Sequence, residues 1–193
     1  MPDVHSVAVF CGSHAGNAPV FRAAATEFGR ALAEASMRLI YGGGRVGLMG
    51  AIADAALSAG GTVIGVIPEF LTRWEVAHEG VADLVVTDSM HSRKRHMFEL
   101  ADVFVSLPGG LGTLDETIEI ITWRQLKLHD KPILICDIAG SAAGLLGLLE
   151  GTIADAFAPP ETRRLYEVAE GVPGLLARLA ELGAGVGGDA ELL

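Results

Sequence analysis

The chain has 193 residues, of which 50% are hydrophobic, and 24 acidic against 14 basic residues give a formal net charge of −10. Such a surface repels nucleic acid and anionic membranes, so we expect neither as a partner. The mean hydropathy is +0.42, yet no apolar run is long enough to cross a bilayer. The first ten residues have an acidic flank and no basic region, unlike a signal peptide, and we therefore expect a cytoplasmic protein.

Short Val- and Ile-rich runs alternate along the chain with stretches of helical period. Strands are predicted at residues 7–11, 38–41, 62–67, 83–87, 103–107 and 132–136, helices at 19–35, 46–58, 90–100, 113–128, 142–156 and 172–182, and a loop at 158–161. This alternation predicts an α/β fold with a doubly wound, mostly parallel, Rossmann-like sheet. The length suits a single domain over residues 1–182. We expect the glycine-rich tail, 183–193, to be flexible.

The two cysteines, Cys11 and Cys136, lie at the ends of strand-like runs and far apart in the sequence. Two distant cysteines make neither a disulfide scaffold nor a zinc motif. We expect both to be small buried residues in a reducing compartment.

Three glycine-bearing segments, at residues 11–13, 41–47 and 108–113, follow predicted strands. In an open parallel sheet, ligands bind beyond the carboxyl ends of the strands, where backbone N–H groups of glycines and helix N-termini can approach an anion. One such loop is explained equally well by turn geometry alone. Three loops on one edge of a sheet favour a phosphate-bearing ligand.

Two common nucleotide motifs are absent from these loops. The segment GGGRVG, residues 42–47, lacks the GxGxxG pattern after the first strand, and no acidic residue ends the second strand to hold a ribose. No Gly-Lys-Ser/Thr follows a glycine loop. The sequence therefore disfavours NAD-dependent hydride transfer and nucleoside triphosphate hydrolysis.

The predicted helix at 90–100 places Met90, Arg93, Lys94 and Met97 on one face, at spacings of i, i+3, i+4 and i+7. Two cations between two methionines suit a pocket for an anion beside a flat apolar base. The alternative is a basic surface patch with half-buried methionines. Arg95 falls on another side of the helix and is expected to be solvated.

Two carboxylates, Asp115 and Glu116, fall in the first turns of the helix that follows the third glycine loop. An acidic residue there is commonly explained by the helix dipole, which suits Asp115. Glu116 lies one turn beyond a loop that could hold a sugar phosphate. A carboxylate in that place can bind ribose hydroxyls, stabilise an oxocarbenium-like centre or orient water.

These segments resemble a known family, the Lonely guy (LOG) proteins. PGGLGTLDE, at 108–116, matches the PGGxGTxxE signature of the family, and SMHSRKRHM, at 89–97, matches its MxxRKxxM element. YGGGRVGLMG, VIGVIPEFL and TWRQLKLHDKPI also resemble the family, so the match spans roughly residues 6–135. The resemblance implies a cytokinin riboside 5′-monophosphate phosphoribohydrolase without a cofactor. Such an enzyme hydrolyses the N-glycosidic bond of N6-modified AMP, and in many members AMP, to free base and ribose 5-phosphate.

The resemblance also implies residue roles and an assembly. Arg93 and Glu116 would form the catalytic pair. The substrate-binding residues would be Ser13, Gly43, Met90, Lys94, Gly109, Gly110, Gly112 and Thr113. The family forms homodimers with the site near the interface, and the expected partner is a small nucleotide. No cluster of His, Cys or Asp has metal-ligand spacing, so we expect no metal. Some relatives were labelled lysine decarboxylases, but no segment predicts a pyridoxal phosphate site.

Two alternatives stay open at this point. One is a nucleosidase of the same class that prefers plain AMP or a pyrimidine nucleotide. The other is a non-catalytic carrier of a phosphorylated nucleotide or pterin cofactor on the same fold. A carrier would need the glycine loops but not the pair formed by Arg93 and Glu116, so the presence of both residues favours the enzyme.

Overall fold

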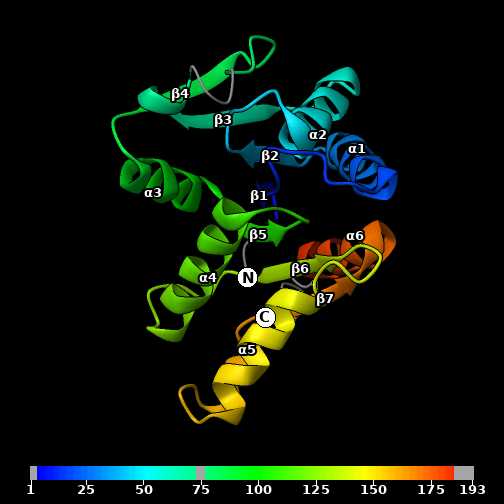
Figure 1. The fold of residues 1–193 in the computed structure, drawn as a ribbon. Coiled ribbons are helices and arrows are strands. Elements are labelled where there is room, and N and C mark those ends of the chain that lie inside the picture. Colours follow the sequence, from blue (N-terminus) through cyan, green and yellow to red (C-terminus); the bar gives the residue numbers. More distant parts are fainter. Residues whose placement is uncertain (1–3, 73–76, 185–193) are drawn as a thin grey trace, which may run out of the picture.

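Seven strands form one sheet at the centre of the molecule, in the order β4-β3-β2-β1-β5-β6-β7 (Figure 1). The computed structural model describes residues 4–72 and 77–184. The strands are β1 (Ser6–Phe10), β2 (Arg38–Tyr41), β3 (Val63–Pro68), β4 (Asp83–Thr87), β5 (Val103–Ser106), β6 (Ile133–Asp137) and β7 (Glu167–Glu170). Each pair of neighbouring strands is parallel. The predicted α/β fold with a doubly wound sheet is confirmed.

In the described part of the chain, six α-helices cover the two faces of this sheet (Figure 1). They are α1 (Pro19–Glu34), α2 (Gly47–Ser58), α3 (Met90–Leu100), α4 (Leu111–Gln125), α5 (Ala143–Ala154) and α6 (Gly171–Ala184), with short 3-10 helices η1 (Glu69–Leu71) and η2 (Pro160–Arg164). Helices α1, α2 and α6 pack against one face of the sheet, and α3, α4 and α5 pack against the other. Among the described helices, none is both long and apolar enough to cross a membrane.

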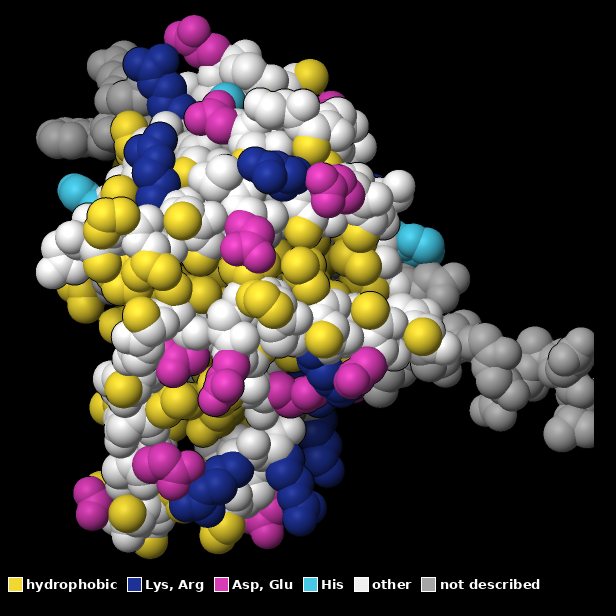
Figure 2. Space-filling view, turned by 90° about the vertical axis from the view of Figure 1, so that its right-hand side faces the viewer, with side chains coloured by type: hydrophobic (Ala, Val, Ile, Leu, Met, Phe, Trp, Pro, Cys, Tyr) yellow, Lys and Arg dark blue, Asp and Glu magenta, His cyan; other side chains and the backbone are white. Residues whose placement is uncertain are grey.

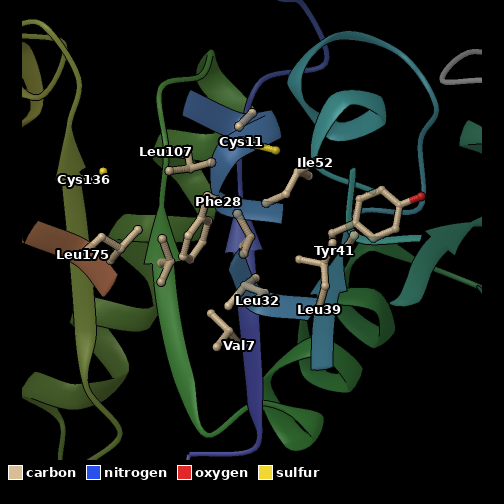
Figure 3. Close-up of a cluster of buried hydrophobic side chains, with 14 of the residues drawn as sticks. Val7, Cys11, Phe28, Leu32, Leu39, Tyr41, Ile52, Leu107, Cys136 and Leu175 are labelled. Atoms are coloured by element: carbon tan, nitrogen blue, oxygen red, sulfur yellow. The ribbon is translucent and has the colours of Figure 1, made fainter. Parts of the chain in front are cut away.

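The hydrophobic core has two layers because successive side chains of a strand point to opposite faces. Val7 and Val9 of β1 join the cluster under α1, α2 and α6, whereas Ala8 and Phe10 join the cluster under α3, α4 and α5. Figure 3 shows part of the first cluster, where Phe28 of α1 reaches the central strands. Burial on both faces explains why these strands are continuous apolar runs in the sequence.

The two cysteines are buried, as expected from the sequence. Cys11 directly follows β1 and Cys136 lies in β6, and β5 lies between these strands (Figure 3). Burial, helped by the negative charges of Asp137 and Glu27, raises the pKa of the Cys136 thiol to about 12. The thiol therefore stays protonated at neutral pH and packs as a small apolar group.

The sequence prediction misses β7, the edge strand formed by Glu167–Glu170. In this strand only Ala169 is buried, so no apolar run marks it. The predicted loop at 158–161 lies partly in η2, which begins at Pro160. The predicted tail is also placed too early, because α6 continues to Ala184. The rest of that tail, 185–193, lies outside the described residues.

The exposed surface mixes apolar and charged side chains. On the side of the molecule that carries α1, α2 and α6, hydrophobic side chains gather in a band, with Lys and Arg above and below it (Figure 2). Some large apolar side chains are well exposed elsewhere, among them Leu111 at 85% and Phe157 at 86%. Leu111 begins α4 and therefore stands at the glycine loop that follows β5.

Candidate functional site

The three glycine loops meet at the carboxyl edge of the sheet, as predicted. They follow β1, β2 and β5, which are neighbours in the sheet. Backbone hydrogen bonds join them: Gly12 N donates to Pro108 O at 3.1 Å, and Leu48 N donates to Gly12 O at 2.9 Å. The chain winds in opposite directions from β1 and β5, so the loops of these two strands frame the switch point where such folds bind ligands.

The loop after β5 leads directly into the N-terminus of α4. Gly110 is the N-cap with extended backbone, and no side chain caps the first turn. A Cβ on Gly109 would lie 2.0 Å from Thr113 Oγ1, so this close packing requires glycine. Around Gly110 and Gly112, by contrast, a Cβ would meet nothing within 4 Å. This N-terminus therefore offers uncapped N–H groups to an anion.

A buried hydroxyl network fixes the first turn of α4. Thr113 is 5% exposed and Thr117 is fully buried. Thr117 Oγ1 lies 2.7 Å from Thr113 O and 2.9 Å from Ser106 Oγ, which ties the helix to the end of β5. These bonds satisfy polar groups that could not reach water. The predicted phosphate-binding segment is thus held on a rigid support.

Two hollows flank this loop. A cavity of about 390 Å³ is lined by residues 12–16, Phe21, Leu48, Pro108–Gly110 and Ser141, and a second of about 200 Å³ lies toward Thr113 and the start of α5. Predicted residues Ser13, Gly109 and Gly110 line the larger hollow. His14 and Ser141 also line it, and the sequence prediction misses both. Ser13 Oγ lies 3.4 Å from His14 Nδ1, so the two side chains are neighbours.

Arg93 of α3 is buried, at 5% exposure, with its side chain at the carboxyl ends of β2 and β3. Its Nε donates to Val66 O at 3.1 Å, and its Nη2 donates to Gly42 O at 3.4 Å. A Cβ on Gly42 would lie 2.2 Å from Arg93 Nη2, so the glycine makes room for the guanidinium. Arg93 Nη1 contacts Met90 Sδ at 3.8 Å. The predicted shared face of α3 is thus confirmed for these residues, whereas Arg95 points outward and pairs with Glu99.

Glu116 of α4 faces Arg93. Its side chain is buried, and its Oε1 lies 3.7 Å from Arg93 Nη2, an ion pair rather than a tight hydrogen bond. Two buried opposite charges are stable only when they compensate each other and find further polar partners. The structure therefore brings together the two residues that the sequence analysis singled out, although their catalytic role stays a prediction.

Lys94 forms ion pairs with two carboxylates of α4, which the sequence analysis did not predict. Its Nζ lies 2.6 Å from Asp115 Oδ2 and 3.1 Å from Glu119 Oε2. Burial lowers the pKa of Lys94, but the hydrogen bonds and charges of the two carboxylates outweigh burial and raise it above its ordinary value. Asp115, interpreted from sequence as a partner of the helix dipole, is also an ion-pair partner of Lys94.

Gly43 stands apart from the other predicted binding residues. It is buried at the end of β2 with a positive φ of 77°, and its carbonyl accepts a hydrogen bond from His78 N at 3.0 Å. A Cβ there would lie 3.0 Å from the Cβ of Ile67. Its glycine is therefore explained by backbone conformation and close packing against β3. Over residues 4–72 and 77–184, no group of three His, Cys, Asp or Glu could hold a metal ion.

This edge defines a class: a Rossmann-like α/β protein with a glycine loop that leads into an uncapped helix N-terminus and a buried charged pair beside it. Residues 49–179 match the model of a family described as possible lysine decarboxylase. The chain is 44% identical, over 92% of its length and 90% of the other's, to a cytokinin riboside 5′-monophosphate phosphoribohydrolase of Rhodococcoides fascians. It is 39% identical, over 91% of its length and 82% of the other's, to one of Arabidopsis thaliana. The chain belongs to this family, the LOG family.

Solved structures support the same fold. A molybdenum cofactor carrier protein of Chlamydomonas reinhardtii matches with a TM-score of 0.69 at 25% identity, over 92% of this chain and 96% of that one. A molybdenum cofactor binding protein of Rippkaea orientalis matches with a TM-score of 0.70 at 21% identity, over 94% and 98% of the two chains. The Rossmann-like assignment is confirmed by these likenesses, which concern architecture.

Proposed function

We propose that this protein hydrolyses the N-glycosidic bond of nucleoside 5′-monophosphates, with cytokinin riboside monophosphates (N6-modified AMP) and AMP as substrates. The products are the free base and ribose 5-phosphate. The observation that carries the proposal is the buried pair of Arg93 and Glu116, 3.7 Å apart, in a structure where the glycine loop leads into an uncapped N-terminus of the same helix α4. Relatives between 38% and 44% identical that are named cytokinin riboside 5′-monophosphate phosphoribohydrolases give it independent support.

The 5′-phosphate would bind at the start of α4. Backbone N–H groups from Gly109 to Thr113, including Gly110 and Gly112, would cradle it, with the favourable dipole of the helix behind them. Ser13 lines the adjoining cavity and can donate its hydroxyl. Met90 is half-buried next to the guanidinium of Arg93, where its flexible side chain can pack against a flat base. Gly43 stays in the proposed binding set as part of the glycine loop after β2, and Lys94 would belong to the site through its ion pairs with Asp115 and Glu119.

Glu116 would act on the sugar. The C1′–N9 bond breaks with its electron pair leaving on the base, and C1′ becomes cationic. A buried carboxylate one turn inside α4 can hold the ribose hydroxyls and steady that cation. Water then adds its oxygen to C1′, while its proton is passed to the base. Glu116 would orient this water and receive its proton on the way to the base.

Arg93 would supply the positive charge. Its guanidinium carries five N–H donors in a planar fork, so it can serve as a cation of fixed shape. It either stabilises the negative charge that develops on the leaving base or fixes the phosphate. A comparison of AMP with adenosine separates these roles. If Arg93 holds the phosphate, Arg93→Met should penalise AMP much more than adenosine, and equal penalties indicate a role at the base.

The site also carries exposed apolar residues that suit a homodimer. Leu111 and Leu114, at the start of α4, are 85% and 37% exposed. Exposed apolar residues that gather at a site commonly mark an interaction surface. A second copy would cover them and bring the site close to the interface. Light scattering of the purified protein should give twice the mass of 20.1 kDa. A cytoplasmic location belongs to the same proposal.

The proposal is tested by chromatography of the products that the purified protein forms from AMP and from isopentenyl-AMP. We expect free base and ribose 5-phosphate in equal amounts, and the ratio of the two rates gives the preference. A matched variant, Glu34→Gln, removes an exposed carboxylate from the end of α1 and should behave like the wild type. Intact nucleotides that bind tightly would instead support the non-catalytic carrier, the candidate that the molybdenum cofactor proteins suggest.

A further inference from the structure

Lys94 lies where α3 and α4 come together. It directly follows Arg93 in α3, and its Nζ bridges Asp115 and Glu119 of α4 at 2.6 and 3.1 Å. These two carboxylates are four residues apart and therefore share one face of α4, on either side of Glu116 in the sequence. The Lys94 side chain is 15% exposed. The bridge thus stands next to the pair of Arg93 and Glu116.

A small void lies between the two helices at this point. Farther along, Phe98 of α3 meets Trp123 of α4 edge-on, with ring centroids 5.2 Å apart. Between these rings and the ion pairs lies a small cavity of about 10 Å³, lined among others by Lys94, Glu116 and Glu119. A void of that size removes dispersion contacts that would otherwise fix the two helices. The charged contacts therefore contribute to the spacing of the two helices at the end near the site.

The distance between Arg93 and Glu116 is set by the elements that carry these two residues. Arg93 is tied to carbonyls of β3 and of the loop after β2, so its guanidinium is fixed relative to the sheet. Glu116 moves with α4. A rotation or shift of α4 would therefore change the distance of 3.7 Å between Arg93 Nη2 and Glu116 Oε1. Lys94 opposes that movement because it holds α4 on both sides of Glu116.

We propose that Lys94 is a positioning residue that holds α4 against α3, so that Glu116 keeps its place opposite Arg93. This inference rests on the proposed function and deepens it, because it gives Lys94 a role through Glu116 in place of direct contact with the substrate. Asp115, a partner of Lys94, is 59% exposed. Glu119, its other partner, is 24% exposed, so the bridge as a whole is partly shielded from water. Loss of the bridge should lower turnover, and thermal melting separates that effect from any loss of stability.

The first test is the division of the effect between kcat and KM. Lys94→Met should lower kcat for AMP by roughly 10- to 100-fold, because small misplacement of a catalytic group is costly, and should change KM by less than about threefold. Lys94→Arg keeps a cation within reach of both carboxylates and should restore most of kcat. A residue that binds the phosphate would show the reverse, with a raised KM and a largely unchanged kcat.

The second test is a mutant cycle. Replacing both partners in one protein, Asp115→Asn with Glu119→Gln, should lower kcat about as much as Lys94→Met. Combining all three changes should lower it no further, since the three residues act as one unit. If Lys94 contacted substrate directly, removal of its partners would leave kcat intact and the effects would add. Either result would overturn the proposal.

Arg95→Met is the matched control. It also removes a cation from α3, but Arg95 is exposed and pairs with Glu99 in its own helix, so kcat should be unchanged. Thermal melting checks that each variant is folded, and Lys94→Gln replaces Lys94→Met if the latter does not fold. A wild-type protein that cleaves no nucleotide would refute the proposed function and this inference together. An active wild type with an additive cycle refutes the inference alone.

Discussion

The two sides of the candidate site differ in the chemical groups that form them. On the side of β1 and β5, the site consists of backbone: the loop of Gly109 and Gly110 leads into the uncapped N-terminus of α4. On the side of α3 and α4, it consists of buried charged side chains, with Arg93 opposite Glu116. Backbone donors suit a fixed phosphate that every substrate shares. Side-chain charges suit the stabilisation of the charge that develops as the glycosidic bond breaks. Substitutions should therefore be able to disturb binding and chemistry separately.

The largest effect is expected on the side-chain half. Arg93→Met removes one partner of a buried ion pair and leaves the Glu116 carboxyl in a poorly compensated environment. Turnover of AMP should fall by roughly 10²- to 10³-fold, as for the loss of one preorganised electrostatic donor. The free energy of unfolding should fall by up to about 3–5 kcal/mol, measured by urea denaturation. The double variant with Glu116→Gln should regain part of that stability, and no recovery would mean that the two charges are not coupled.

A smaller effect is expected on the backbone half. Gly109→Ala places a Cβ 2.0 Å from Thr113 Oγ1, so the loop or the first turn of α4 must shift. Overpacking of this kind costs roughly 1–3 kcal/mol. Calorimetry should show binding of ribose 5-phosphate weakened by about tenfold, which corresponds to 1.4 kcal/mol.

Gly147→Ala is the matched control for that substitution, because a Cβ at this position of α5 meets nothing within 4 Å. It should leave binding unchanged and raise the stability of the exposed helix by up to about 1 kcal/mol. If Gly109→Ala and Gly147→Ala behave alike, the close approach of Gly109 to Thr113 has no role in the cradle.

The smallest effect concerns the start of α3. Ser89 and Ser92 form a capping box, and both hydroxyls donate to Asp88 Oδ1, which lowers the pKa of the Asp88 carboxyl. A depressed pKa means stability that is present above the unfolded value of 3.8 and lost as the pH falls through the folded value. Asp88→Asn should therefore lower the melting temperature slightly at neutral pH. The difference should vanish in acid, and a constant difference would contradict this origin.

The backbone half of the site was the more predictable from sequence. Glycine loops after Val-rich runs mark the ends of buried strands, and their place on one edge follows from a parallel sheet. The sequence also singled out Arg93 and Glu116 by their residue types and neighbours. Their approach to 3.7 Å, by contrast, depends on how α3 and α4 pack on the same face of the sheet. No local pattern contains that information.

Other features escaped prediction for the same reason. Lys94 looked like a cation facing a ligand, because its two partners lie more than twenty positions along the chain on another helix. His14 and Ser141 enter the larger hollow through the fold of loops that follow β1 and β6. The edge strand β7 has a single buried side chain, Ala169, and among the described strands it pairs only with β6. Each of these features depends on contacts between segments that are far apart in the sequence, so no local pattern could predict it.

The separation of binding from chemistry is tested most directly by Glu116→Gln. The amide keeps the shape of the side chain but cannot carry the negative charge that would steady the sugar cation. Turnover of AMP should fall by roughly 10²- to 10⁴-fold, the range for loss of an acid–base group. In the same protein, the dissociation constant of ribose 5-phosphate should stay within about threefold of the wild type, because the cradle is backbone. Turnover at the wild-type rate would contradict the central claim.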